Sequence, residues 1–270
     1  MKNCLIIVNT HKKESQEMGR IISEYLNGRK ISSSIFSFDG FYDENAFCRA
    51  DEKPFVSADF VITLGGDGTV LFAARKCVEH GIPVFPINFG EFGFIASIQK
   101  DEWKIELDLF LQEKAKIVER NMLQSVVIDG KTGKNVYSGI GLNDIVISAK
   151  MASRTILMNV DFNYVSLGKF KADGIIVCTA TGSTAYSSSA GGPIVDPTMD
   201  AIILTPKNSF SLSSRPLVLN PHGELEITIL PSRESDIIIT LDGQTPFDIH
   251  EGDCIKIRQI AKKVTSQQWF

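Results

Sequence analysis

Residues 60–74 read FVITLGGDGTVLFAA: an apolar run, a turn of three glycines around one aspartate, and a second apolar run. The first run has the length of a buried strand, and the second continues as a helix. Glycines in such a turn let the backbone approach a bulky anion and adopt φ values barred to other residues, while the helix offers unpaired N–H groups. The stretch therefore predicts a phosphate-handling turn between a strand and a helix.

Asp67 is the unusual member of this turn. A carboxylate repels phosphate, so it must either accept a proton from an attacking hydroxyl or hold a cation, and both point towards phosphoryl transfer. The alternative is an ordinary connection, because Asp followed by Gly is common turn chemistry. The residues match neither a P-loop, which ends in Gly-Lys-Ser/Thr, nor a Gly-x-Gly-x-x-Gly dinucleotide turn.

Strands and helices alternate around this turn, which is typical of a parallel sheet with helices on its faces. Ligands bind beyond the carboxyl ends of strands in such sheets, where Gly65–Thr69 and Asn88–Gly93 would lie. Apolar periodicity predicts strands over Cys4–Val8, Ile35–Phe38, Val61–Leu64 and Val84–Asn88, and helices over Glu14–Leu26, Thr69–His80 and Asp101–Lys114.

The pattern changes in the second half of the chain. From Leu123 onward, short alternating runs are separated by turns such as Asp129-Gly130 and Asp242-Gly243. In the run 224–229, Leu and Ile alternate with Glu and Thr, as in a strand with one buried face. We therefore expect an α/β domain with a parallel sheet over residues 1–115, followed by a β-rich antiparallel domain over 116–250.

Composition excludes several classes of protein. The chain has 270 residues and a formal net charge of -4, without a basic block, which does not fit a nucleic-acid-binding protein. A secretory signal and an apolar run of membrane-spanning length are both missing from the sequence, so we expect a cytoplasmic protein that does not bind membranes. The five cysteines are scattered and the four histidines lack ligand spacing, so we expect reduced thiols and no structural metal.

Residues 171–193, KADGIIVCTATGSTAYSSSAGGP, hold the densest group of small polar side chains. The apolar centre predicts a strand that leads into a hydroxyl-rich stretch with many donors for sugar, phosphate or amide groups. Tyr186 could stack on a base. The alternative is a polar loop, although turns seldom combine so many hydroxyls with a tyrosine.

Together these residues resemble the NAD kinase family over most of the chain. The resemblance implies a two-domain fold shared with diacylglycerol kinases, a last stretch, about 250–270, that packs back on the first domain, and homodimers or homotetramers. Its marks, in order, are Gly65–Thr69, Asn88–Phe94, Asn143-Asp144, Asp173–Pro193 and Asp242-Gly243-Gln244.

The resemblance also implies the reaction. In this family the terminal phosphoryl group of ATP or polyphosphate is transferred to the 2′-hydroxyl of the adenosine ribose of NAD, which gives NADP, and Mg²⁺ is carried by the ATP phosphates. Asp67 matches the general base. Phosphoryl transfer depends on positioning and charge stabilisation, which a carboxylate at the hydroxyl can supply.

Binding roles are carried over by the same resemblance. Asn143 and Asp144 match a pair that contacts the ribose, and Asp173 matches the residue that holds the nicotinamide amide. Each also has an ordinary structural explanation, as a turn or a solvated charge. The other expected nucleotide contacts are Gly66, Gly68, Phe94, Arg154, Lys171, Thr181, Thr184, Ala185, Tyr186, Ser187, Ser188, Ser189 and, more weakly, Gln244.

Two departures and two alternatives remain. The family more often has Glu at the position of Asp144, and Ser209-Phe210 replaces a common Pro-His. Lipid kinases of the diacylglycerol or sphingosine type share the Gly-Gly-Asp-Gly-Thr turn, but tend to follow it with Asn-Glu rather than Val70-Leu71. A non-catalytic dinucleotide sensor could use the same fold, although an intact Asp67 argues against it.

Overall fold

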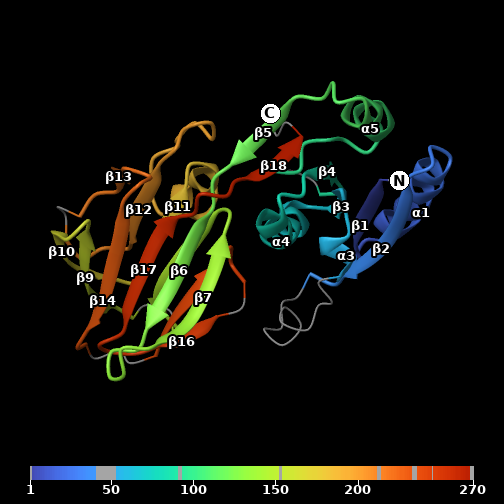
Figure 1. Ribbon diagram of the computed structural model, residues 1–270. Helices are drawn as coiled ribbons and strands as arrows, with labels where there is room; N and C mark the ends of the chain where they lie inside the picture. The colour runs from blue at the N-terminus through green and yellow to red at the C-terminus, as the bar shows by residue number, and fades with distance from the viewer. Residues whose placement is uncertain are drawn as a thin grey trace. The chain divides into compact units, whose positions relative to one another are not determined.

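A computed structural model of the protein describes residues 2–40, 53–90, 93–151, 154–211, 214–232, 236–244 and 246–267 (Figure 1). The chain divides into two compact units. Unit 1 contains Met1–Arg120 and Lys262–Phe270, and unit 2 contains Asn121–Ala261. The second unit is thus inserted between two segments of the first.

Unit 1 contains a six-stranded sheet in the order β2-β1-β3-β4-β18-β5. Neighbouring strands are parallel except for the last pair, because β5 runs antiparallel to β18. Figure 1 shows β18, from the end of the chain, beside β5. The strands are β1 (Asn3–Asn9), β2 (Ser32–Phe38), β3 (Phe60–Gly65), β4 (Val84–Asn88), β5 (Ile117–Arg120) and β18 (Val264–Gln267).

The four strands expected in this part of the sequence are confirmed, and so are the three helices. The expected helix over 101–114 is shorter in the structure, since it ends at Leu111 and Glu113 adopts a φ of 58°. Gly81, with a φ of 65°, ends the turn after the second helix, as a glycine readily does. The helices are α1 (Lys13–Asn27), α3 (Lys53–Val56), α4 (Asp67–Cys77), the 3-10 turn η1 (Val78–His80) and α5 (Trp103–Leu111).

Helices cover both faces of this sheet. Ile22 of α1 and Leu107 of α5 are fully buried in one core with alternate residues of β1 and β3. On α4, Phe72 stacks on Phe38 of β2 with ring centroids 4.7 Å apart, and its edge meets Phe55 of α3. The strands β1, β3 and β4 are buried on both faces, which explains their continuous apolar sequences.

Unit 2 contains two antiparallel sheets, in the orders β10-β9-β14-β17-β6-β7 and β13-β12-β11-β8-β15-β16. The strands of the first are β6 (Leu123–Ile128), β7 (Asn135–Gly141), β9 (Ile156–Phe162), β10 (Val165–Ala172), β14 (Glu224–Leu230) and β17 (Cys254–Gln259). Those of the second are β8 (Asp144–Ala149), β11 (Gly174–Thr179), β12 (Ile202–Lys207), β13 (Leu217–Leu219), β15 (Ile237–Leu241) and β16 (Phe247–Ile249).

Alternating side chains of the two sheets form one core. Leu225, Ile227 and Ile229 of β14 are buried in it, as their period of two predicts, and they share it with Ile145 of β8 and Val177 of β11. This packing confirms the expected fold class: an α/β unit with a mostly parallel sheet and a β-rich antiparallel unit.

The other face of the second sheet is covered by the hydroxyl-rich segment. Val146, Ile176 and Cys178 point away from the main core and pack with Val195 and Ala201 in a smaller cluster. Between Cys178 and Val195 the chain forms a 3-10 turn η2 (Thr181–Thr184) and a short helix α6 (Tyr186–Ser189). The segment is therefore anchored by apolar residues at both ends. No helix in the described part of the chain is long and apolar enough to cross a membrane.

Candidate functional site

Asp67 is the first residue of α4 and lies at the carboxyl end of β3. Its side chain accepts three backbone hydrogen bonds. Oδ2 accepts the N–H of Phe94 at 3.0 Å, and Oδ1 accepts the N–H groups of Ile95 and Ala96 at 3.1 and 3.0 Å. A carboxylate has about four lone-pair sites, so one on Oδ2 is left for a further donor such as a substrate hydroxyl.

The glycines of the turn are needed for space rather than for unusual backbone angles. None of Gly65, Gly66 and Gly68 has a positive φ, so the expectation of φ values barred to other residues is wrong. A Cβ at Gly65 would lie 2.1 Å from Thr69 Oγ1, whereas Cβ atoms at Gly66 and Gly68 would have no atom within 4 Å. Gly65 therefore allows the tight turn, while the other two leave open space beside the backbone.

Two loops meet at this edge of the sheet, as the sequence suggests. Asn88 ends β4 beside Gly65, and the N–H of Phe89 donates to the Gly65 carbonyl oxygen at 2.7 Å. A Cβ at Gly93 would lie 2.6 Å from the Ala96 carbonyl oxygen and 3.2 Å from Asp67 Oδ1. Only glycine fits there, so the second loop is shaped to hold the carboxylate. Residues 91 and 92 lie outside the described ranges.

Unit 2 brings a second set of expected site residues together. Asn143 and Asp144 lie where β8 begins, next to the ends of β11 and β15. The N–H of Thr179 donates to the Asn143 carbonyl oxygen at 3.0 Å, and a Cβ at Gly182 would lie 2.0 Å from the same oxygen. Among the described residues, the buried Oδ1 of Asn143 has no hydrogen-bond partner. An unsatisfied buried oxygen is costly, so this atom is a candidate ligand contact.

Asp144 is the titratable group of this set. Its side chain lies in a residue that is only 5% exposed. Burial, and secondly the nearby charge of Asp242, raise the pKa of Asp144 to about 7. Desolvation and a neighbouring negative charge both disfavour the ionised form. At neutral pH this carboxyl group is therefore divided between its protonated and ionised forms.

The hydroxyl-rich segment uses many of its donors internally. Thr184 and Ser188 donate to the carbonyl oxygens of Thr181 and Ala185 at 3.2 and 2.9 Å. Ser187 is fully buried, and its Oγ lies 2.8 Å from Thr205 Oγ1. The expected surplus of donors is thus partly consumed by η2 and α6, and the hydroxyl oxygens remain available as acceptors.

Tyr186 and Gln244 lie at the margins of this set. Tyr186 is 40% exposed, and the Lys207 ammonium lies 5.5 Å from the centre of its ring. Gln244 follows the turn after β15, where its N–H donates to the Leu241 carbonyl oxygen at 3.0 Å. Ala185 precedes Tyr186 and Ser187 follows it, so the aromatic ring has small neighbours in the sequence, and Ser189 is the last residue of α6.

Three other expected residues lie away from the Asn143–Asp144 loop, one before β11 and two on or before the strands β10 and β9 of the first sheet. Asp173 precedes β11, and its Oδ2 accepts a hydrogen bond from the Asn208 amide at 3.0 Å. The Lys171 ammonium lies 5.4 Å from the centre of the Phe210 ring, and Arg154 precedes β9. Cys178 pairs with Asp144, so Asp173 lies five residues, or about 17 Å, further along β11. Within one chain these residues do not join the Asn143 set.

Sequence reasoning did not assign a role to Asp242 or Thr179. Asp242 accepts backbone hydrogen bonds from Leu142, Asn143 and Asp144, and Thr179 Oγ1 donates to the Leu142 carbonyl oxygen at 2.7 Å. The available signal was the Asp242-Gly243 turn, in which Asp242 has a φ of 52°. Asp is one of the few residues that tolerate this conformation.

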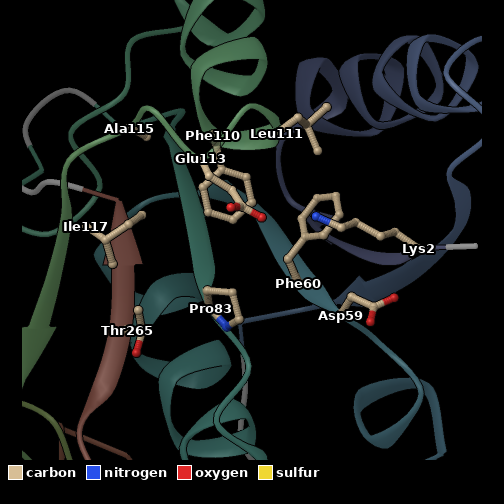
Figure 2. A pocket seen from close by; sticks show the side chains of 10 residues that line it. All are labelled: Lys2, Asp59, Phe60, Pro83, Phe110, Leu111, Glu113, Ala115, Ile117 and Thr265. Carbon is tan, nitrogen blue, oxygen red and sulfur yellow. The ribbon is translucent and has the colours of Figure 1, made fainter.

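A pocket of about 420 Å³ lies at the other edge of the sheet in unit 1. Figure 2 shows Phe60 and Phe110 within it, with Lys2, Asp59 and Glu113 around them. It is formed where β1, β3 and β4 begin, so it is distinct from the Asp67 turn, which lies where β3 ends. In the described ranges there is no group of three or more His, Cys, Asp or Glu residues that could hold a metal ion.

Comparisons with known proteins agree over almost the whole chain. Residues 4–115 match the family model of the ATP-NAD kinase N-terminal domain, and residues 142–266 match that of the C-terminal domain. An NAD kinase of Treponema denticola is 42% identical over 98% of this chain and 90% of its own length. An NAD kinase of a Thermoanaerobacter species is 34% identical over 96% of this chain and 91% of its own.

Solved structures show the same fold. Yeast NADH kinase complexed with NADH superposes with a TM-score of 0.86 at 24% identity, over 99% of this chain and 83% of that one. An NAD kinase from Archaeoglobus fulgidus in complex with ATP gives a TM-score of 0.77 at 22% identity, over 99% and 94%. The structural neighbours therefore support the two-unit architecture independently of close sequence identity.

Proposed function

Because the chain belongs to the NAD kinase family and is an NAD kinase, we propose that its Asp67 turn supplies the general base and that its Asn143–Asp144 loop contacts the ribose of NAD. The reaction is phosphoryl transfer to the 2′-hydroxyl of the adenosine ribose, which yields NADP. The observation that carries the proposal is the Asp67 carboxylate, held by three backbone N–H groups with one acceptor position left over. The family match leaves no place for the lipid-kinase alternative.

In this proposal Asp67 orients the ribose hydroxyl and accepts its proton. Phosphoryl transfer has a loose transition state, so the nucleophile needs positioning more than strong activation. The three N–H donors fix the carboxylate geometry before substrate binds, and pre-organisation of this kind lowers the entropic cost of reaching the transition state. Phe94 contributes through its N–H, which donates to Oδ2, the oxygen that keeps an acceptor position.

We assign the dinucleotide to residues of unit 2. Asn143 Oδ1 and the Asp144 carboxyl group can accept hydrogen bonds from ribose hydroxyls, and the exposed face of Tyr186 can stack on a base. Thr181, Thr184, Ala185, Ser188, Ser189 and Gln244 complete the proposed contacts, while Ser187 supports them from the core. Asp173 is proposed to hold the nicotinamide amide, and Arg154 and Lys171 are proposed to approach the bound ligand.

ATP is the proposed donor, and Gly66 and Gly68 are its proposed neighbours in unit 1. Both leave open space beside the start of α4, where backbone N–H groups favour phosphate oxygens. Mg²⁺ neutralises phosphate charge when it arrives bound to ATP. The protein's own part is then to align the phosphate chain with the ribose hydroxyl.

The protein is further proposed to act in the cytoplasm as a homodimer or homotetramer. Ile194 and Phe210 of unit 2 are 74% and 69% exposed, and large exposed apolar side chains are common at subunit interfaces. Sedimentation equilibrium of the purified protein measures the assembly. A mass equal to one chain at micromolar concentration would contradict this part of the proposal.

The function itself is tested by transfer of labelled phosphate. The purified protein is incubated with Mg²⁺, NAD and γ-labelled ATP, and the products are separated to find label in NADP. Polyphosphate replaces ATP in a second reaction, and diacylglycerol replaces NAD in a third. We expect label in NADP with ATP and none in lipid. Absence of labelled NADP with every donor would refute the proposed reaction.

A further inference from the structure

We infer that Asp242 is a positioning residue, which fixes the Asn143–Asp144 loop for dinucleotide binding and sets the charge of that loop. The inference rests on the proposed role of Asn143 and Asp144. Neither the family comparison nor the sequence gives Asp242 this task. It follows from the hydrogen bonds at the turn after β15 and from the burial of two carboxyl groups side by side.

The Asp242 carboxylate holds three consecutive backbone N–H groups. Oδ2 accepts from Leu142 at 3.0 Å, and Oδ1 accepts from Asn143 at 2.7 Å and from Asp144 at 3.2 Å. In return, the N–H of Asp242 donates to the Asp144 carbonyl oxygen at 2.9 Å. Four bonds between one residue and one loop determine where the side chains of Asn143 and Asp144 point.

The carbonyl side of the loop is held by Thr179. Its Oγ1 donates to the Leu142 carbonyl oxygen at 2.7 Å, and its N–H donates to the Asn143 carbonyl oxygen at 3.0 Å. Thr179 Oγ1 also accepts the N–H of Gly182 at 3.0 Å, which links the loop to η2. The backbone of the loop is thus satisfied from both sides, while the buried Oδ1 of Asn143 is not, within the described ranges.

A purely structural clasp would not require two buried carboxyl groups. Asp144 and Asp242 are only 5% and 9% exposed, and burying like charges together is costly unless one of them is neutral. The three N–H donors stabilise the negative charge on Asp242, so the proton of the pair resides on Asp144. The charge of Asp242 therefore influences the pH at which Asp144 ionises and becomes a charged, stronger acceptor for a ribose hydroxyl.

Few other groups can titrate next to Asp144. The described elements packed against this loop are β6, β11, β15 with its following turn, and η2. Besides Asp242, they present one titratable side chain, the thiol of Cys178, while β7, which leads into the loop, carries Tyr137 four residues before its end. Burial is the main reason why the pKa of this thiol is raised to about 12, so it stays neutral in the working range. A pH effect on the loop can therefore be traced to the two aspartates.

The first test measures kcat and KM for NAD between pH 5.5 and 9. In the wild-type protein kcat/KM for NAD should rise with pH through a midpoint near 7, because the free enzyme's Asp144 must ionise. In Asp242→Asn, the amide cannot accept all three N–H bonds and carries no charge. We expect KM for NAD to rise about tenfold, with kcat changed less, and the midpoint to move to lower pH.

The matched control is Asp253→Asn. Asp253 is also buried, 5% exposed, and accepts the N–H groups of Gly130 and His250 at 2.9 and 2.8 Å, but it joins the turn after β6 to the turn before β17. Its amide variant loses the same kind of bonds without touching the Asn143 loop. A shifted midpoint in this control, or an unshifted midpoint in Asp242→Asn, would overturn the inference.

Two further variants separate the possible failures. Thr179→Val loosens the loop without changing its charge, so it should raise KM for NAD and leave the midpoint unmoved. If Asp242→Asn does not fold, the inference can still be refuted in two ways. One is an unchanged KM for NAD in Thr179→Val, and the other is a wild-type pH profile of kcat/KM whose midpoint lies far from pH 7. Asn143→Ala tests the proposed contact between Asn143 and NAD. An unchanged KM for NAD in this variant contradicts the proposed NAD contacts. A raised KM in Asn143→Ala, together with an unchanged KM and pH profile in Asp242→Asn, contradicts only the role of Asp242.

Discussion

Gly182 lies against the backbone of Asn143 so closely that a Cβ added to Gly182 would be 2.0 Å from the Asn143 carbonyl oxygen. Real Cβ atoms do not approach a backbone oxygen this closely, so Gly182→Ala must displace the Asn143–Asp144 loop. We expect KM for NAD to rise at least about tenfold, equivalent to about 1.4 kcal/mol. Gly28→Ala is the control, because its Cβ would meet only ordinary contacts, 3.5 Å from the nearest atom. Equal kinetics of the two variants would contradict the prediction.

Asp67→Asn should lose turnover and keep NAD binding. The amide preserves the size of the side chain but is a very poor proton acceptor, so kcat should fall by about 100-fold or more, the usual contribution of a general base. NAD affinity, measured by calorimetry without donor, should remain within a few-fold of the wild type. Asp129→Asn, in an exposed turn of unit 2, is the control with unchanged kcat. Wild-type turnover in Asp67→Asn would remove Asp67 from the mechanism.

Substitutions of Gly65 and Gly68 should have different effects, one on the free energy of unfolding and the other on KM for ATP. A Cβ at Gly65 overlaps Thr69 Oγ1, so Gly65→Ala should lower the free energy of unfolding by about 1–3 kcal/mol, as overpacking does. Gly68→Ala has open space and gains helix propensity, so its stability should be equal or slightly higher. Its KM for ATP should nevertheless rise, because a methyl group occupies the proposed phosphate position. Urea unfolding and steady-state kinetics measure both, and a destabilised Gly68→Ala would contradict this account.

Asp144 should make stability depend on pH. Its pKa is raised from an ordinary value near 4 to about 7 in the folded protein. Between these values the native state keeps a proton that the unfolded chain has released, so the contribution of this group to the free energy of unfolding falls as pH rises and levels off above about 7. Asn cannot titrate, so in Asp144→Asn this group no longer lowers the free energy of unfolding as pH rises.

The measurement is thermal or urea unfolding of wild type and Asp144→Asn at pH 5, 6, 7 and 8. The variant should gain stability relative to the wild type across this series, with a total on the order of 4 kcal/mol at most for a shift of three pKa units. A difference between the two proteins that is independent of pH would show that Asp144 ionises normally.

Tyr186→Ala should weaken NAD binding by about 1–3 kcal/mol, the range found for the loss of base stacking on an aromatic ring. The ring is 40% exposed and has room to accept a base. Tyr186→Phe keeps the ring and should bind NAD like the wild type, which separates stacking from hydrogen bonding by the hydroxyl group. Unaltered affinity in Tyr186→Ala would place the base elsewhere.

Much of the fold could be predicted because three strands of unit 1, β1, β3 and β4, are apolar and end at a glycine or an asparagine. Asn3–Asn9 and Val84–Asn88 are such strands, and their alternation with helices predicted that they are parallel. β5 and β18 could not be predicted, since each has four residues and a mixed sequence, and only pairing across the sheet makes them strands. Short strands are determined by tertiary contacts more than by local pattern.

Candidate site residues could be named from the sequence, but the hydrogen bonds that hold them in place could not. Asp67 stands out because it follows an apolar strand in a glycine-rich turn, whereas Asn143 is expected only from the resemblance to the family. The N–H groups that hold Asp67, from Phe94 to Ala96, belong to the backbone, and backbone donors leave no mark in a sequence. For the same reason Asp242 reads as an ordinary Asp-Gly turn, although its carboxylate binds a loop a hundred residues earlier.

The place of β18 has a consequence for how the chain folds during synthesis. β5 joins the sheet of unit 1 only through β18. The ribosome synthesises β18 after all of unit 2. Unit 2 is continuous, and its two ends are joined by the N–H of Ile260 donating to the Met122 carbonyl oxygen at 3.0 Å. Domains tend to fold as they emerge. Unit 2 can therefore complete its sheets while unit 1, although begun first, still waits for its fifth and sixth strands.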